Sequence, residues 1–452
     1  MPKAKNAVWR FFASVKLALF SLIVLAAVSI IGTVIKQGQD PSYYGQEYGA
    51  TLSRLFEALG ITNMYSSWWF VFLLFLFAVN LVVCSIERLP RVWHLVTQDN
   101  LNLDPHQLKK RNLTHQIHAD LPTATAAERI HQVMTRIGWR KILRLDRKET
   151  ALLFSQKGSW SRLGVYVVHL SILVILVGAI TGTFFGFKAF VYLPEGRSTD
   201  KIFLQRNQAP VPLPFELYCD RYDTTFYPNG MVKEYRLDLT VFDPEEQAPY
   251  RKTVIVNDPL SYRGLTFYQA ESYPLEEYFI VIRNNTTGME QAFRVPSNRD
   301  VSWPGTRVTF RIEELKNDQD GAVRQAKIHF TSGEDSPPSF WIKDRETVSL
   351  QAQGDQFTLS FRQLYTTLLL VKKDPGVLIV YAGCILMLTG LAMVFFLSHR
   401  RIWILLESGT QKQGSMILIS GVSNKNKSAF EQRFEDLAEK LEKELPNPTG
   451  KE

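Results

Sequence analysis

Four long hydrophobic stretches constrain this chain more than any other feature of its sequence. Each approaches the roughly 20 apolar residues that an α-helix needs to cross the hydrocarbon core of a bilayer. They occupy residues 17–35, 68–86, 163–185 and 377–397. The first follows basic residues, as a signal peptide does, but it is longer than the usual apolar region and no A-x-A cleavage pattern follows it. We therefore predict an α-helical membrane protein with four transmembrane helices, the first of them retained.

The positive charges of the chain lie mainly beside these stretches. The net charge of +8 and the pI near 9.2 would, taken alone, permit a nucleic-acid-binding protein. However, the segment 87–162 carries about twice as many Lys and Arg as Asp and Glu, which is typical of cytoplasmic loops and excludes nucleic acid as the expected partner. In the cytoplasmic (inner) membrane, we predict three cytoplasmic segments, 1–16, 87–162 and 398–452, and two extracytoplasmic ones, 36–67 and 186–374.

Large water-facing parts must accompany the hydrophobic stretches, because the mean hydropathy of the chain is only −0.08. The segment 186–374 contains short runs of alternating hydrophobic and polar residues, separated by turn residues. This pattern is typical of β-strands. We predict a large β-rich extracytoplasmic domain, folded as a sandwich or an open barrel.

The segments 87–162 and 398–452 each combine strand-like runs with a helical pattern. We predict that they join into one small α+β cytoplasmic portion. Ser428 and Glu431 have the spacing of a capping box at the start of the last helix. This helix carries hydrophobic residues on one face, namely Phe430, Phe434, Leu437, Leu441 and Leu445. An alternative is that the helix lies on a partner or on the membrane surface.

The pattern of cysteines argues against several kinds of cysteine-dependent site. Cys84, Cys219 and Cys384 form no CxxC pair, so neither a disulfide framework nor a zinc knuckle is supported. The sequence also contains no CxxCH, the attachment motif of c-type haem. We therefore do not expect the chain to be a c-type cytochrome itself.

His169 is the only histidine inside a predicted membrane span. Polar and ionisable side chains at this depth are costly, and they usually face a partner, a cavity or a cofactor. A neutral imidazole is also a common ligand of metals and of haem iron. Alternatively, His169 forms a hydrogen bond to a backbone carbonyl or to Asn80 in the second span. The sequence alone leaves these two interpretations open.

Five blocks of the sequence carry a family resemblance. They are LALFSLIVLAAVSIIGTVIKQ at 17–37, YSSWWFVFLLFLFAVNLVVCSIERLPR at 65–91, KGSWSRLGVYVVHLSILVILVGAITG at 157–182, VNDPLSYRGLTFYQAESY at 256–273 and DPGVLIVYAGCILMLTGLAMVFFLSHRRIW at 374–403. In this order, they resemble the ResB (CcsB) family of cytochrome c biogenesis proteins of the System II pathway. The polar pieces NDPLxYxGxxFYQ and SHRR make the resemblance specific.

The resemblance implies a role in moving haem. Proteins of this family work with a second membrane protein, ResC (CcsA), which carries the tryptophan-rich WWD motif. Here Trp68 and Trp69 are followed by Phe70, so the chain resembles the partner subunit. The pair exports haem b and attaches it to the CxxCH thiols of apocytochrome c, so catalysis belongs to the complex. The alternative is a scaffold that presents apocytochrome c without binding a cofactor.

The resemblance also assigns His169 as the haem ligand, because the family uses a transmembrane histidine. Since no other histidine lies at this depth, a second axial ligand would come from the partner. Small residues that permit close helix packing line another stripe of the same span; they are Gly164, Ser171, Gly178 and Gly182. His169 projects away from this stripe.

Two further groups of residues are weaker candidates. His399, Arg400 and Arg401 end the fourth span and could receive haem propionates, or they could serve as a positive-inside anchor. In the predicted β-rich domain, a turn-forming segment and its aromatic residues could contact the apocytochrome. These residues are Asn257, Asp258, Tyr262, Phe267 and Tyr268. For most of the aromatic residues, a place in the core is the alternative.

Overall fold

The computed structural model describes residues 6–101, 104–147, 150–228, 231–318, 321–333, 339–408 and 414–445. The ends of the predicted cytoplasmic segments, 1–5 and 446–452, lie outside the described residues. The chain forms two compact units. Unit 1 comprises Met1–Val177 and Leu378–Glu452, and unit 2 comprises Gly178–Val377.

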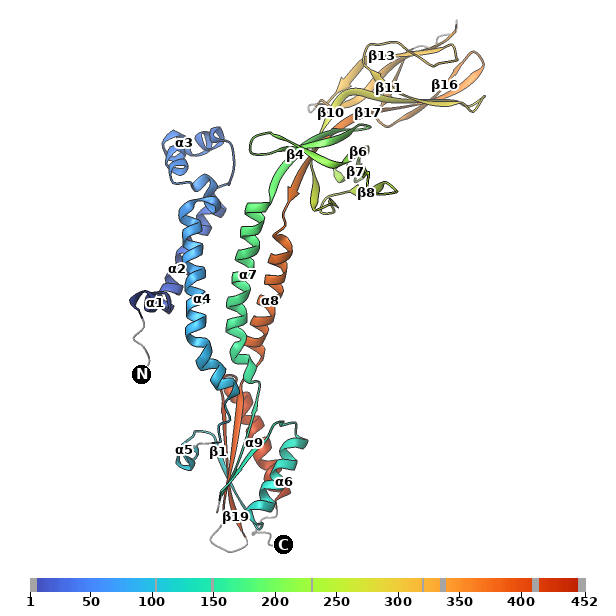
Figure 1. The fold of residues 1–452 in the computed structure, drawn as a ribbon. Helices are drawn as coiled ribbons and strands as arrows, with labels where there is room; N and C mark the ends of the chain where they lie inside the picture. Colours follow the sequence, from blue (N-terminus) through green and yellow to red (C-terminus); the bar gives the residue numbers. More distant parts are fainter. Residues whose placement is uncertain are drawn as a thin grey trace. The chain divides into compact units, whose positions relative to one another are not determined.

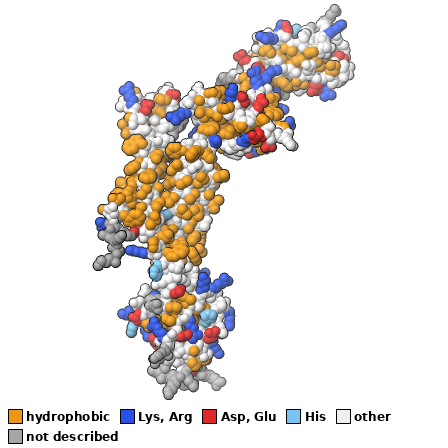
Figure 2. Space-filling model, viewed as in Figure 1, with side chains coloured by type: hydrophobic (Ala, Val, Ile, Leu, Met, Phe, Trp, Pro, Cys, Tyr) orange, Lys and Arg blue, Asp and Glu red, His pale blue; other side chains and the backbone are white. Residues whose placement is uncertain are grey.

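Four helices are long and apolar enough to cross a membrane, which agrees with the four predicted spans. They are α2 (Val15–Val34), α4 (Trp68–Thr97), α7 (Gly164–Phe185) and α8 (Val377–Phe396). Their outward side chains are apolar, and Figure 2 shows a continuous hydrophobic surface over them. α4 continues past the predicted end at residue 86, through Pro90 to Thr97, so its last turns carry charged residues.

The helices pack in pairs, with α2 beside α4 and α7 beside α8 (Figure 1). Small residues allow the second pair to approach closely. A Cβ atom on Gly390 of α8 would lie 2.8 Å from Cγ2 of Val168, and one on Gly383 would lie 3.2 Å from the backbone oxygen of Ser171. A Cβ on Gly164 would lie 3.1 Å from the backbone oxygen of Gly390. The predicted small-residue stripe of α7 therefore faces α8.

Short helices border these spans. α1 (Ala7–Phe12) precedes α2, and α3 (Pro41–Ala58) with the 3₁₀ helix η1 (Ile61–Ser66) connects α2 to α4. A second 3₁₀ helix, η2 (Ser159–Leu163), leads directly into α7.

Beyond its long helices, unit 1 contains a five-stranded antiparallel sheet with the order β1-β19-β18-β3-β2. Its strands are β1 (Thr114–Ala119), β2 (Leu143–Asp146), β3 (Thr150–Lys157), β18 (Arg400–Ser408) and β19 (Ser415–Ser423). Because β18 pairs with β3, the two predicted segments join in one sheet. α5 (Pro105–Lys109), α6 (Thr123–Arg136) and α9 (Lys427–Glu444) accompany it.

α9 packs on this sheet through the predicted hydrophobic face. Phe430, Phe434 and Leu441 are buried in one core with residues of α6 and the strands. The alternative that α9 rests on a partner through this face is therefore wrong. The predicted capping box is also absent: Asn426 is the N-cap residue, and Ser428 already lies within the helix.

Unit 2 is β-rich, as predicted. A ten-stranded sheet has the path β11-β10-β17-β4-β5-β6-β7-β8, to which β16 and β9 pair at the side, and a four-stranded sheet has the order β12-β13-β14-β15. Two long strands, β10 (Leu265–Asn284) and β17 (Asp355–Lys373), contribute residues to both cores of the unit. One of these cores lies between the two sheets, which gives a sandwich there.

The remaining strands of unit 2 are shorter or bent. They are β4 (Phe187–Pro194), β5 (Ser198–Leu204), β6 (Pro210–Phe226), β7 (Val232–Phe242), β8 (Tyr250–Val254), β9 (Leu260–Tyr262), β11 (Glu290–Pro296), β12 (Val301–Ser302), β13 (Val308–Asn317), β14 (Val323–Ser332), β15 (Phe340–Lys343) and β16 (Thr347–Ala352).

Candidate functional site

His169 lies on α7, half-buried against α4. Its Nδ1 atom is 2.9 Å from the hydroxyl oxygen of Ser85 on α4. Its ring meets Tyr166 edge to face, with 6.3 Å between the ring centroids. Among the described residues, none forms a hydrogen bond with Nε2. One ring nitrogen is therefore engaged by the neighbouring helix, and the other is available to a ligand.

Asn80 makes a different contact from the one that the sequence suggested. Its side-chain amide donates a hydrogen bond to the backbone oxygen of Phe12 at 2.7 Å. One turn further along α4, the Cys84 thiol donates to the backbone oxygen of Ala13 at 3.1 Å. The alternative of a His169–Asn80 bond is therefore wrong. Instead, Asn80 and Cys84 hold the turn between α1 and α2 against α4.

A hollow of about 570 Å³ lies beside these contacts between α4 and the turn that joins α1 to α2. Tyr166 lines it, three residues before His169 on α7, and Arg88 lines it, three residues after Ser85 on α4. At 1.5 Å of helical rise per residue, the hollow begins about 4.5 Å along the helices from the imidazole. Its other lining residues are Trp9, Arg10, Ala13, Glu87, Arg91 and Val92.

Three guanidinium groups and one carboxylate line this hollow, which we call the arginine pocket after Arg10, Arg88 and Arg91. The Trp9 ring nitrogen donates to Glu87 at 3.0 Å and so fixes α1 against α4. Guanidinium groups bind carboxylates in a bidentate geometry. The sequence did not predict this pocket, because these arginines could not be distinguished from the positive charges that ordinarily flank a membrane span.

His399 is buried, with 1% of its surface exposed. Its Nδ1 accepts a hydrogen bond from Arg162 at 2.8 Å, and its Nε2 lies 2.9 Å from the amide oxygen of Gln156. Burial, assisted by the charges of Arg162 and Arg401, lowers the pKa of His399 to about 4. Both ring nitrogens are thus engaged within the chain, and His399 joins the end of α8 to β3 and η2. A role of His399 at a haem stays a prediction.

The two neighbouring arginines have different contacts. The Arg401 guanidinium lies 5.3 Å from the ring centroid of Trp403, and burial lowers its pKa. The Arg400 side chain points to a separate hollow beside α9. Arg401 thus stays close to His399 and Arg162, whereas Arg400 lines a separate hollow.

The polar family block of unit 2 forms a hairpin between β9 and β10. Arg263 and Gly264 both have positive φ, at 45° and 76°, which is the geometry of a tight two-residue turn. Tyr262 donates its hydroxyl to Asp243 at 2.8 Å, and Arg263 pairs with the same carboxylate at 2.6 Å. Although burial raises the pKa of Asp243, the backbone N–H of Glu245 together with Tyr262 and Arg263 holds this pKa below its usual range. Tyr262 therefore stabilises the hairpin.

The remaining predicted client-surface residues differ in exposure. Phe267 has 0% of its surface exposed and belongs to a core, so its assignment to a surface is wrong. Tyr268, which points to the opposite side of β10, is 43% exposed. Asn257 and Asp258 are exposed as well, and Asp258 pairs with Lys252 at 2.5 Å.

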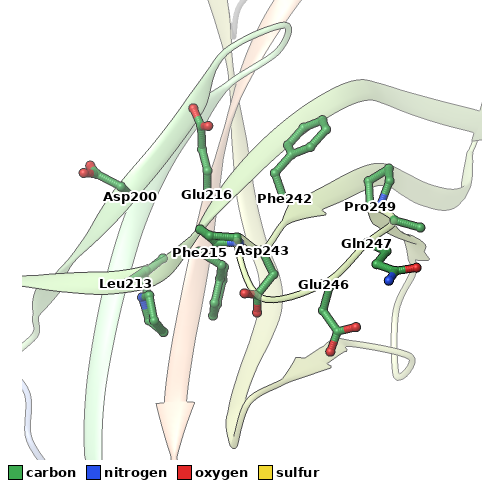
Figure 3. A pocket seen from close by; sticks show the side chains of 12 residues that line it. Asp200, Leu213, Phe215, Glu216, Phe242, Asp243, Glu246, Gln247 and Pro249 are labelled. Atoms are coloured by element: carbon green, nitrogen blue, oxygen red, sulfur yellow. The ribbon is translucent and has the colours of Figure 1, made fainter.

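Asp243 also lines a hollow of about 490 Å³ (Figure 3). Acidic side chains, among them Asp200, Glu216 and Glu246, line it together with Phe215 and several prolines. Within the residues that the structure describes, no group of three or more His, Cys, Asp or Glu side chains could hold a metal ion. Unit 2 thus offers a hollow lined by acidic side chains. His169 remains the main candidate ligand for haem iron.

The fold and the site together define a class: a protein with four membrane-length helices, a half-buried histidine on one of them, and a separate β-rich unit. Comparison with known proteins identifies the family. The model of the ResB-like family matches residues 15–334 and 307–435, so the chain belongs to this family.

Several relatives match nearly the whole chain. One is the cytochrome c biogenesis protein CcsB of Gloeobacter violaceus, with 29% identity over 95% of this chain and 90% of the relative. A second is CcsB of Microcystis aeruginosa, with 29% identity over 95% of this chain and 94% of the relative. A third is the cytochrome c biogenesis protein Ccs1 of Porphyra purpurea, with 24% identity over 96% of each chain. The resemblance seen in the sequence is confirmed.

Proposed function

We propose that this chain is a haem-handling membrane subunit in the maturation of cytochrome c. Its family and the names of its relatives support the maturation role. The observation that carries the haem role is the Ser85–His169 contact, which engages Nδ1 and leaves Nε2 for a ligand. Histidines that bind metal commonly use one nitrogen for the metal and the other for a hydrogen-bonded partner.

The arginine pocket supports this proposal independently. Haem b is an apolar ring with two carboxylates on one edge. The half-buried imidazole of His169 would bind the iron, and Arg10, Arg88 and Arg91 would pair with the carboxylates. Because the pocket lies close to His169 along α4 and α7, one haem could contact both.

The site is incomplete in this chain, which argues for a partner. Among the described residues, no second histidine lies beside His169. We propose that a ResC (CcsA)-type protein with a WWD motif supplies the second axial ligand, and that the pair exports haem and attaches it to the CxxCH thiols of apocytochrome c. The transfer reaction then belongs to the complex, in the cytoplasmic membrane, with unit 2 outside the cytoplasm and the five-stranded sheet inside.

A scaffold that only presents apocytochrome c is the second candidate. Its support is the exposed group of Asn257, Asp258 and Tyr268 on unit 2. The two functions differ in one result. In the purified complex, His169→Ala should lower the haem content several-fold under the first, and the matched control His94→Ala, an exposed histidine on α4, should not. Equal haem in both variants would favour the scaffold.

A further inference from the structure

A second hollow, of about 270 Å³, lies in the α+β part of unit 1 and collects cations from three elements. Lys157 ends β3, Arg400 begins β18, and Arg433 and Lys440 lie on α9. Asp436 is the one acidic residue that lines it. We call this hollow the Lys157 pocket.

The cations of the Lys157 pocket repel one another. Lys157 and Arg400 are directly opposite in the antiparallel pairing of β3 and β18, and like charges in such pairs are destabilising. The pKa of Lys157 is lowered first by burial and then by the charges of Arg400, Arg433 and Arg140. Burial and the charge of Arg433 also lower the pKa of Arg400.

Few contacts within the chain relieve this repulsion. In the described part of the chain, no ion pair reaches Lys157, Arg400 or Arg433. The Lys157 ammonium lies 4.6 Å from the ring centroid of Trp139, and Arg400 donates to the hydroxyl of Ser398 at 3.0 Å. These contacts orient the two cations but do not neutralise them. An anion bound in the hollow would neutralise their charge.

The position of the Lys157 pocket in the chain indicates which anion it takes. Lys157 stands two residues before η2, which opens into α7, and Arg400 stands four residues after the end of α8. Trp160, beside the first of these ends, is 58% exposed. Exposed tryptophans at span ends mark the level of lipid headgroups. We propose that the Lys157 pocket binds the phosphate of an anionic phospholipid headgroup. This proposal does not depend on haem binding.

The test uses the full chain, purified, delipidated and returned to nanodiscs or detergent with defined lipid. Native mass spectrometry should find phosphatidylglycerol retained in preference to phosphatidylcholine. Arg433→Gln or Lys157→Gln should weaken this retention about fivefold, the effect of one cation near a membrane surface. The matched control is Lys443→Gln, an exposed cation of α9 that pairs with Glu439 outside the hollow.

The midpoint of thermal unfolding distinguishes a variant that has lost lipid binding from one that is misfolded. Because Lys157→Gln removes a repulsive cross-strand pair, it should leave the midpoint of thermal unfolding unchanged or higher in lipid-free detergent, while it reduces the stabilisation by phosphatidylglycerol. Equal lipid retention by Arg433→Gln and Lys443→Gln would overturn the site. Stabilisation by inorganic phosphate equal to that by phosphatidylglycerol would overturn the assignment to a lipid.

Discussion

The hydroxyl of Ser85 on α4 lies 2.9 Å from Nδ1 of His169 on α7. This contact joins two helices that are separated in the sequence by the segment 98–163, and it sets the orientation of the His169 imidazole. The ring is therefore positioned before any ligand arrives.

Ser85→Ala should weaken haem binding without removing the ligand. Loss of a partner that orients a metal-binding histidine typically lowers affinity by about tenfold or more. We expect a reduced affinity in haem titrations of the purified complex, with the absorbance spectrum of the bound haem little changed. Ser29→Ala, a change in α2 away from His169, is the control. Equal haem affinities for the two variants would show that Ser85 does not orient His169 for haem binding.

Arg88→Gln should weaken haem retention by about tenfold or more, because a charge-assisted hydrogen bond to a carboxylate is lost. The iron ligand remains, so the spectrum of the haem that stays bound should resemble that of the wild type. Arg129→Gln, an exposed cation on α6, is the matched control. A haem analogue with esterified propionates should bind wild type and Arg88→Gln equally; a preserved difference would contradict carboxylate pairing.

Gly383→Ala should destabilise the packing of α7 against α8. Its Cβ would lie 2.6 Å from Cγ1 of Ile175, and overpacking of this kind typically costs about 1–3 kcal/mol. We expect a lower midpoint of thermal unfolding in detergent. Gly45→Ala on α3 is the control, because its Cβ would meet nothing within 4 Å. Indistinguishable midpoints would mean that the two helices do not approach this closely.

Stability should fall as the pH is lowered, because of His399. Its pKa is about 4 in the folded chain and 6.5 when unperturbed, so the unfolded chain binds more protons between these values. The contribution is fully present above pH 6.5 and is lost as the pH falls towards 4. At 1.36 kcal/mol per pKa unit, the loss is about 3 kcal/mol.

The measurement is the unfolding midpoint from pH 7 to pH 4 in a nonionic detergent. His399→Gln cannot titrate and should show a shallower pH dependence than the wild type. His118→Gln, an exposed histidine of β1, should retain the wild-type slope. Parallel curves for wild type and His399→Gln would place the pH sensitivity elsewhere.

The proposed topology makes two exposed positions differ in accessibility. Thr287→Cys in unit 2 should react in intact cells with a membrane-impermeant maleimide, whereas Glu435→Cys on α9 should react only after lysis. Both changes are made in a background in which Cys84, Cys219 and Cys384 are replaced by serine. Labelling of Glu435→Cys in intact cells would reverse the proposed orientation.

The sequence was sufficient where a property depends on length or periodicity. Twenty apolar residues in a row indicate a membrane-length helix, whatever their neighbours, and the 3.6-residue spacing from Phe430 to Leu441 correctly indicated the buried face of α9. Alternation along β10 also explains why Phe267 is buried and Tyr268 exposed, so the surface assignment of Phe267 could have been avoided.

Contacts between segments could not be predicted in this way. The rotation of α4 about its axis decides whether Asn80 or Ser85 meets His169, and apolar residues all round the helix leave that rotation open. The arginine pocket needs α1 folded back on α4, which depends on the bonds from Asn80 and Cys84 to backbone oxygens. The burial of His399 likewise follows from strand pairing between distant segments.

The most direct test of the central claim is whether a nitrogen of His169 is bonded to haem iron. The chain is produced with ¹⁵N-labelled histidine, combined with unlabelled partner, and studied by pulsed EPR with the haem in its ferric state. We predict hyperfine coupling from one directly coordinated ¹⁵N, lost in His169→Gly and kept in His94→Gly. Absence of this coupling in the wild-type complex, or its persistence in His169→Gly, would contradict the account.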